Sequence, residues 1–82
     1  MRISVKLFGR YKEIAGTDKI QLHITEGITL QDVINTFVKK YPSVEKDKSR
    51  MIATKNKMYA SFDTTLGEGD EITISPPIVS GG

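Results

Sequence analysis

The residues that could carry out chemistry stand at the C-terminal end of this 82-residue sequence. A proline pair, Pro76 and Pro77, is followed by uncharged residues and then by Gly81 and Gly82. Prolines end a β-ladder and stiffen the chain that leaves it, so we expect residues 76–82 to project as a tail. Because glycine has no Cβ, the tip is no wider than the backbone and could thread a narrow channel.

A carboxylate at this tip would be accessible but is a poor electrophile. Activation with ATP to an acyl-adenylate would make it reactive toward a sulfur or an amine nucleophile. We therefore predict that Gly82 is the reactive residue. A partner's channel would take up the residues before it, Gly81, Ser80, Val79 and Ile78. A frayed terminus without function is the alternative that two glycines alone leave open.

Length and composition exclude most other ways in which the chain could act. A chain of this size buries one core of two layers and cannot wall a deep pocket, so a self-contained enzyme is not expected. The sequence has no cysteine and only one histidine, His23. Thiol nucleophiles and cysteine zinc sites are therefore excluded, and we expect no metal and no bound cofactor.

Charge and hydropathy argue against nucleic-acid and membrane partners. The net charge of +2 is too small to indicate nucleic-acid binding by itself. No apolar run approaches the roughly 20 residues of a membrane span, and Arg2, Lys6 and Arg10 interrupt any signal-peptide core. We expect a cytoplasmic protein.

The elements that must position the tail follow from hydrophobic periodicity. Alternating residues predict strands over 2–8 and 20–24, with a short helical turn over 10–15 between them. An apolar stripe predicts an amphipathic helix from Thr29 to Tyr41. Thr29 and Asp32 have the spacing of a capping box at its start.

The second half of the chain adds three predicted strands. Residues 51–55 and 58–62 form a hairpin around Asn56, and residues 71–75 form the last strand. Residues 43–50 are polar and are predicted to be a solvated loop. This order places one main helix on one mixed sheet. We predict an α+β fold, the β-grasp or ubiquitin-like roll, as a single domain over residues 1–82.

Some side chains suggest a docking surface. Five apolar residues near strand ends could form a patch beside the tail, where a partner would dock: Phe8, Tyr59, Phe62, Pro76 and Pro77. Core packing is the alternative for the aromatic residues. The basic residues between 46 and 57 are predicted to be solvated, or else to steer an acidic partner. RNA binding is not expected because no aromatic residues are interleaved with these charges.

The C-terminal third, SFDTTLGEGDEITISPPIVSGG, resembles the MoaD/ThiS sulfur-carrier family. The segment KLFGRYKEIAGTD is similar to that family's first strand and helix. The similarity is greatest to the molybdopterin synthase small subunits within the family, which usually have one residue fewer between the prolines and the glycines. The residues that carry the resemblance at the C-terminal end are Leu66, Gly69, Asp70, Glu71, Ile72, Ile74, Pro76, Pro77, Gly81 and Gly82.

The resemblance implies a sulfur carrier for molybdenum cofactor biosynthesis that is not catalytic alone. An E1-like adenylyltransferase would use ATP to adenylate Gly82, and a sulfur donor enzyme would convert it to a thiocarboxylate. The large catalytic subunit of molybdopterin synthase, in a heterotetramer, would then accept the tail. A ubiquitin-like protein modifier and a thiamine-pathway sulfur carrier would use the same tail, so these alternatives stay open. A plain binding module is a further alternative.

Overall fold

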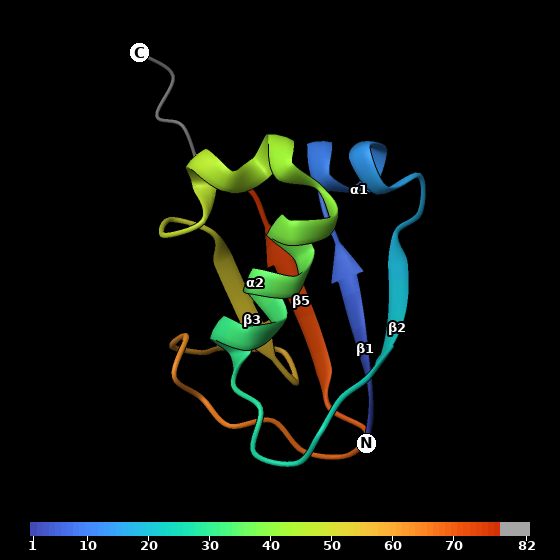
Figure 1. Ribbon diagram of the computed structural model, residues 1–82, viewed down its shortest axis with the longest axis vertical. Coiled ribbons are helices and arrows are strands. Elements are labelled where there is room, and N and C mark those ends of the chain that lie inside the picture. The colour runs from blue at the N-terminus through green and yellow to red at the C-terminus, as the bar shows by residue number, and fades with distance from the viewer. Residues whose placement is uncertain (78–82) are drawn as a thin grey trace.

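The computed structural model describes residues 1–77, and its strands form one mixed sheet (Figure 1). The strands are β1 Arg2–Leu7, β2 Lys19–His23, β3 Ile52–Lys55, β4 Met58–Tyr59 and β5 Glu71–Ser75. Their order across the sheet is β2-β1-β5-β3-β4. The central strands β1 and β5 are parallel, whereas every other neighbouring pair is antiparallel. The predicted tail residues Ile78, Val79, Ser80, Gly81 and Gly82 lie outside the described residues.

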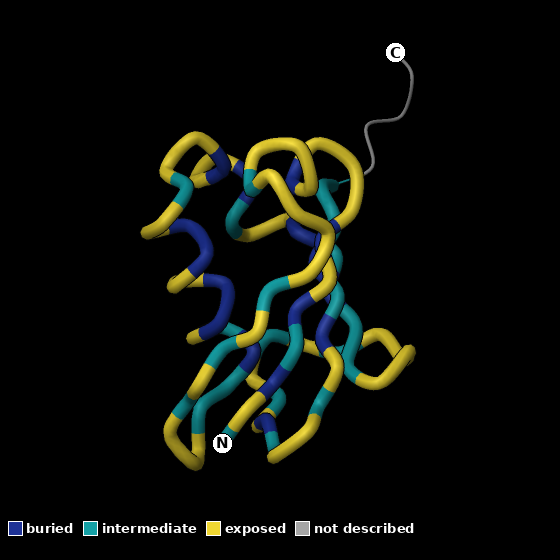
Figure 2. Tube along the Cα trace, turned by 90° about the vertical axis from the view of Figure 1, so that its right-hand side faces the viewer, coloured by how far each residue is buried: buried dark blue, intermediate teal, exposed yellow. Residues whose placement is uncertain are grey.

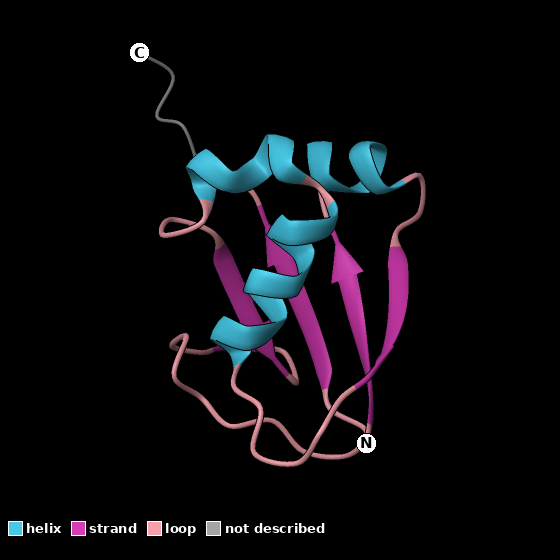
Figure 3. Ribbon diagram, viewed as in Figure 1, coloured by secondary structure: helices cyan, strands magenta, loops and turns pink. Residues whose placement is uncertain are grey.

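The main helix, α2 Leu30–Lys40, lies across one face of this sheet (Figure 3). Its predicted capping box is confirmed, because the Thr29 amide donates to the Asp32 carboxylate at 2.9 Å and the Asp32 amide donates to the Thr29 hydroxyl at 3.4 Å. The apolar stripe of α2 is buried against the sheet, as the periodicity predicts: Leu30, Val33, Ile34, Phe37 and Val38. One mixed sheet packed against one main helix confirms the predicted α+β arrangement.

The connection between the first two strands is the short helix α1 Arg10–Ala15, as predicted. It ends at Gly16, which adopts the left-handed conformation, and the Gly16 amide donates to the Lys12 carbonyl at 3.0 Å. Tyr11 is the buried residue of this helix. Together with the 3-10 helix η1 Pro42–Asp47, α1 lies at the end of the sheet where β1 and β5 finish (Figure 1).

Two predictions for the middle of the chain are wrong. The solvated loop predicted over 43–50 begins as η1, and its Asp47 is buried with 3% of its surface exposed. The strand predicted over 58–62 ends at Tyr59. The chain leaves the sheet there because backbone carbonyls of the following residues accept hydrogen bonds from the first amides of α2. Gln31 donates its amide to the Phe62 carbonyl at 2.7 Å, and Leu30 donates to Thr64 at 2.9 Å.

The sheet has an apolar face against α2 and a more polar face on the opposite side, here called the open face. On β1 the side chains toward α2, Ile3, Val5 and Leu7, are each 1% exposed. Figure 2 shows the buried positions of strands and helix facing one another. By strand alternation the open face carries Ser4, Lys6, Thr73, Ser75, Ile52, Thr54 and Tyr59. Within residues 1–77, none of the helices has the length and apolar character needed to cross a bilayer.

Candidate functional site at the base of the tail

The parallel pairing of β1 with β5 places Phe8 beside the base of the predicted tail. Both strands finish at the same end of the sheet, and the Phe8 amide donates to the Ile74 carbonyl at 3.3 Å. The chain then leaves the sheet through Pro76 and Pro77, which are half-buried. The structure therefore brings together Phe8, Pro76 and Pro77 of the predicted docking residues.

Gly9 shapes this base because it lies directly against Pro76. An ideal Cβ at Gly9 would come within 3.3 Å of the Pro76 Cγ atom, which is tighter than an ordinary contact. Gly9 also has a φ of +57°, in the region that residues with side chains rarely adopt. The contact between the Gly9 backbone and the Pro76 ring therefore fixes the position of the start of α1 relative to the tail base.

A substitution at Gly9 is expected to disturb this base. Gly9→Ala should lower the free energy of unfolding by about 2–3 kcal/mol, because a Cβ strains the backbone and presses on Pro76. The matched control is Gly16→Ala, at a φ of +73° with nothing within 4 Å of its Cβ, which should cost about 1 kcal/mol. Denaturant unfolding measures both. Equal losses of unfolding free energy in the two variants would show that the contact between Gly9 and Pro76 does not contribute to stability.

The aromatic residues of the predicted patch occupy different places. Phe8 is 42% exposed, and the Lys6 Nζ atom lies 5.4 Å from its ring centroid. Tyr59 is 84% exposed on the open face, but it stands on the edge strand β4, which is separated by β5 and β3 from the strand that leads to Phe8. Phe62 is half-buried against the core, near the start of α2, which is the far end of the sheet from the tail base. The structure does not bring Phe62 together with Phe8.

The structure adds two apolar residues that the sequence prediction missed. Ile52 lies on the open face opposite Ser75, so it stands next to the last strand before the tail. Met58 is 74% exposed beside Tyr59 on the edge strand. The alternation of Ile52, Ala53 and Thr54 could have placed Ile52 on the open face. This surface, defined by Phe8, Ile52, Tyr59, Pro76 and Pro77, is here called the tail-base surface.

The turn before β5 is held by a network around Asp70. The Asp70 carboxylate accepts from the Gly67 amide at 2.7 Å and from the Asn56 side-chain amide at 3.0 Å, and the Lys55 Nζ atom lies 3.6 Å away. Burial alone would raise the pKa of Asp70, but the Gly67 amide, Asn56 and Lys55 outweigh it and hold this pKa below its usual range. Asp70 therefore stabilises the turn that precedes β5.

Residues 1–77 contain no group of three or more metal-ligating side chains close enough to hold a metal ion. The sole histidine, His23, is exposed on β2. In the described part of the chain, Phe8, Pro76 and Pro77 thus lie together where the chain leaves the sheet.

Comparisons with known proteins give a family match and a relative that is similar over nearly the whole chain. Residues 5–82 match the ThiS family. The chain is 34% identical over 81 residues to the molybdopterin synthase sulfur carrier subunit of Arabidopsis thaliana, covering 99% of this chain and 84% of that protein.

Two solved structures show the same fold. The crystal structure of SAMP1 from Haloferax volcanii has a TM-score of 0.81 at 22% identity and covers 99% of this chain and 100% of that one. A complex of subunits 1 and 2 of the molybdopterin-converting factor from Helicobacter pylori contains a chain with a TM-score of 0.66 at 18% identity, covering 99% of this chain and 100% of that one. These likenesses confirm the predicted ubiquitin-like β-grasp fold.

Proposed function

Because this chain belongs to the ThiS family, we propose that it is the small, sulfur-carrying subunit of a molybdopterin synthase and acts in the cytoplasm. The observation that carries this proposal is the 34% identity over nearly the whole chain to a molybdopterin synthase sulfur carrier subunit. The parallel β1–β5 pair supports it, because that pair directs the C-terminal segment out of the sheet beside an exposed aromatic residue.

The proposed reaction takes place at the carboxylate of Gly82. An activating E1-like enzyme would join this carboxylate to the adenylyl group of ATP and release pyrophosphate. Hydrosulfide delivered by a sulfur donor enzyme would then attack the acyl carbon and displace AMP, which leaves a thiocarboxylate. The carrier needs no cofactor of its own for these steps, because ATP is bound and consumed by the activating partner.

The partner proposed for sulfur transfer is the large catalytic subunit, in a heterotetramer. A related solved structure is a complex of two molybdopterin-converting factor subunits, and the tail-base surface of this chain has the features of a docking site. Phe8 and Tyr59 are exposed aromatic residues, which are enriched at interface hot spots. The tail residues Ile78, Val79, Ser80 and Gly81 would enter the partner's active site and place Gly82 next to the pterin precursor.

The decisive experiment is an intact-mass measurement of the full chain after incubation with ATP, an E1-like activating enzyme and sulfide. We expect a mass gain equal to the exchange of one oxygen for one sulfur, and loss of that gain when ATP is left out. The loaded protein should then yield molybdopterin when the large subunit and the pterin precursor are added. Conjugates to other proteins without any thiocarboxylate would instead identify a protein modifier.

A further inference from the structure

We propose that the groove between β2 and α2 binds an extended peptide segment of a second protein, which adds a strand to the free edge of β2. The groove lies on the α2 side of the sheet, whereas Phe8 and Tyr59 face the open side. This site is therefore distinct from the tail-base surface, and the inference does not depend on the proposed function.

The backbone of β2 is available for such pairing. β2 is the outermost strand at one edge of the sheet. Ile24 exchanges hydrogen bonds with Met1 at 2.7 and 2.8 Å, and the Asp18 carbonyl accepts from the Leu7 amide at 2.8 Å. In an antiparallel pair, residues whose backbone groups bond to the partner strand alternate with residues whose backbone groups point away from it. The amides and carbonyls of Gln21 and His23 thus point outward, and an added strand could bond to them.

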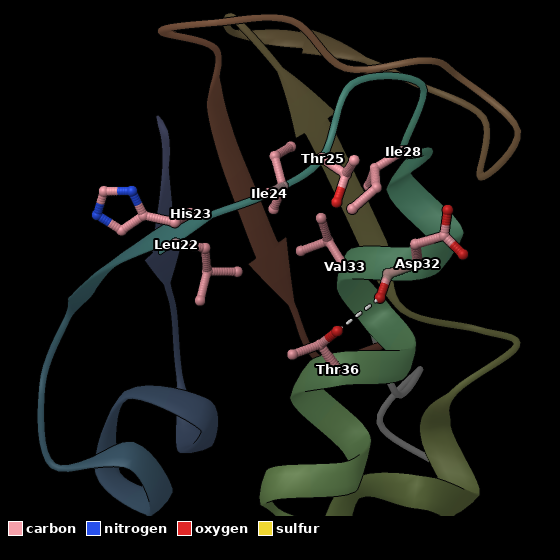
Figure 4. Close-up of a pocket in the computed structure, with 8 residues that line it drawn as sticks. All are labelled: Leu22, His23, Ile24, Thr25, Ile28, Asp32, Val33 and Thr36. Atoms are coloured by element: carbon pink, nitrogen blue, oxygen red, sulfur yellow. Dashed lines mark hydrogen bonds between the residues drawn. The ribbon is translucent and has the colours of Figure 1, made fainter. Parts of the chain in front are cut away.

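Beside this edge lies a groove with an apolar floor. A cavity of about 150 Å³ opens between β2 and α2 (Figure 4). Leu22, Val33 and Thr36 line both this cavity and a second hollow that continues toward Tyr41. In Figure 4, Leu22 and Ile24 point from β2 toward α2, whereas His23 points away.

The side chains of β2 that face the groove are only half-buried. This holds for Ile20, Leu22 and Ile24, although the equivalent residues of the neighbouring strand β1 are almost completely buried. The difference arises because α2 lies over the central strands and leaves the edge strand less covered (Figure 1). An occupant with apolar side chains at alternate positions would bury this remaining surface.

A positive charge at one end of the groove selects the occupant. Lys40 lines the groove at the C-terminal end of α2, where Ile20 of β2 also lines it. Lys40 makes no salt bridge with any residue of 1–77. Lys19 is not part of the groove, because it lies on the open face opposite Lys6. The fitting partner is therefore an extended segment with alternating apolar residues and with carboxylates at its end beside Lys40.

The test uses the full chain and a synthetic probe. The probe is an acetylated and amidated peptide of alternating valine and threonine that ends in a run of glutamates, and the matched control peptide has glutamines in their place. We expect the amide NMR signals of β2 and of the groove side of α2 to shift, with a dissociation constant on the order of 1 mM. The glutamine peptide should bind roughly threefold to tenfold more weakly. The amides of Gln21 and His23 should gain protection from hydrogen exchange.

Matched variants locate the site. Lys40→Glu should weaken binding of the glutamate peptide roughly threefold to tenfold. Lys39→Glu, on the same turn of α2 but outside the groove lining, should leave binding within about twofold. Thr36→Arg should abolish binding, because Thr36 is an exposed residue whose replacement fills the groove without touching the core.

The following results would overturn the proposal. They are an absence of shifts at millimolar peptide, shifts confined to the open face or to β4, and equal effects of the Lys39 and Lys40 variants. Shifts of the groove amides that grow with protein concentration alone would assign the groove to a second copy of this chain, and would also overturn it.

Discussion

Removal of Gly81 and Gly82 is expected to abolish sulfur transfer and to leave the stability of the protein unchanged. Without the proposed terminal glycine, the carboxylate that remains would stop short of the reacting atoms in the partner's active site. Within residues 1–77, the buried core residues all lie between Ile3 and Ile74, so the free energy of unfolding should change by less than about 0.5 kcal/mol. Molybdopterin formation with the large subunit and denaturant unfolding measure the two effects.

A substitution in the tail-base surface should separate docking from chemistry. Phe8→Ala removes a ring that is 42% exposed, and its matched control, Ile14→Ala, removes an apolar side chain that is 38% exposed on α1. If Phe8 is an interface hot spot, its variant should bind the large subunit about tenfold or more weakly, whereas the Ile14 variant should bind within about twofold.

In the same binding assay, the variant that lacks Gly81 and Gly82 should behave in the opposite way to the Phe8 variant. It should keep measurable docking through the tail-base surface while transferring no sulfur. Sulfur transfer at the wild-type rate by the deletion variant would contradict the proposed role of the tail. Equal binding by the Phe8 and Ile14 variants would contradict the proposed docking surface, and would leave the chemistry at Gly82 to be judged separately.

Periodicity predicted the elements whose residues face one core. The strand at the N-terminus, the helix from Thr29 and the last strand were all predictable, because each has apolar residues at the spacing of its own secondary structure. The capping box at Thr29 and Asp32 was also predictable, since it depends on residues three positions apart. The fold class followed from the order of these elements.

Contacts between distant segments were not predictable in the same way. β4 is short because the carbonyls of the following loop accept hydrogen bonds from the start of α2. No local sequence pattern predicts these long-range hydrogen bonds. Phe8 lies beside Pro76 only because β1 and β5 pair in parallel. Their positions near predicted strand ends therefore grouped Phe62 with Phe8, although the fold places these two rings at opposite ends of the sheet.

Asp47 is the clearest example of a long-range contact, because its own neighbourhood in the sequence is polar. The Asp47 carboxylate accepts a hydrogen bond from the Tyr11 hydroxyl at 2.8 Å and forms an ion pair with the Arg10 guanidinium. Both partners come from α1, so this contact joins α1 to η1. The Tyr11 ring in turn packs against Phe37 of α2, with 5.4 Å between the ring centroids. One carboxylate thus ties both short helices to the core.

Replacing this carboxylate is expected to lower the stability of the protein strongly. Asp47→Ala should lower the free energy of unfolding by about 2–4 kcal/mol, because it leaves the buried Tyr11 hydroxyl without an acceptor and the Arg10 charge without a partner. The lower values of this range allow for Arg10, because its side chain is 45% exposed and water can solvate its charge once the carboxylate is removed. Tyr11→Phe removes only the hydroxyl and should cost about 1–2 kcal/mol.

The same contact should make the stability depend on acidity. Burial alone would raise the pKa of Asp47, but the Tyr11 hydroxyl and the Arg10 guanidinium outweigh it and hold this pKa below its ordinary value of 3.8. A carboxyl whose pKa is lower in the folded than in the unfolded state stabilises the fold fully above the unfolded pKa. That contribution is lost as the pH falls below 3.8 and through the folded value.

Denaturant unfolding at a series of pH values checks this prediction. The wild-type free energy of unfolding should fall between neutral pH and the acidic range, and Asp47→Asn should flatten the part of that fall due to Asp47. The Asp70 carboxyl also has a lowered pKa, so a residual slope should remain and should become smaller in the double variant with Asp70→Asn. A wild-type pH profile retained by Asp47→Asn would show that the pKa of Asp47 is the same in the folded and unfolded states. The contacts with Tyr11 and Arg10 would then add nothing to the stability of the charged carboxylate, which would contradict the prediction.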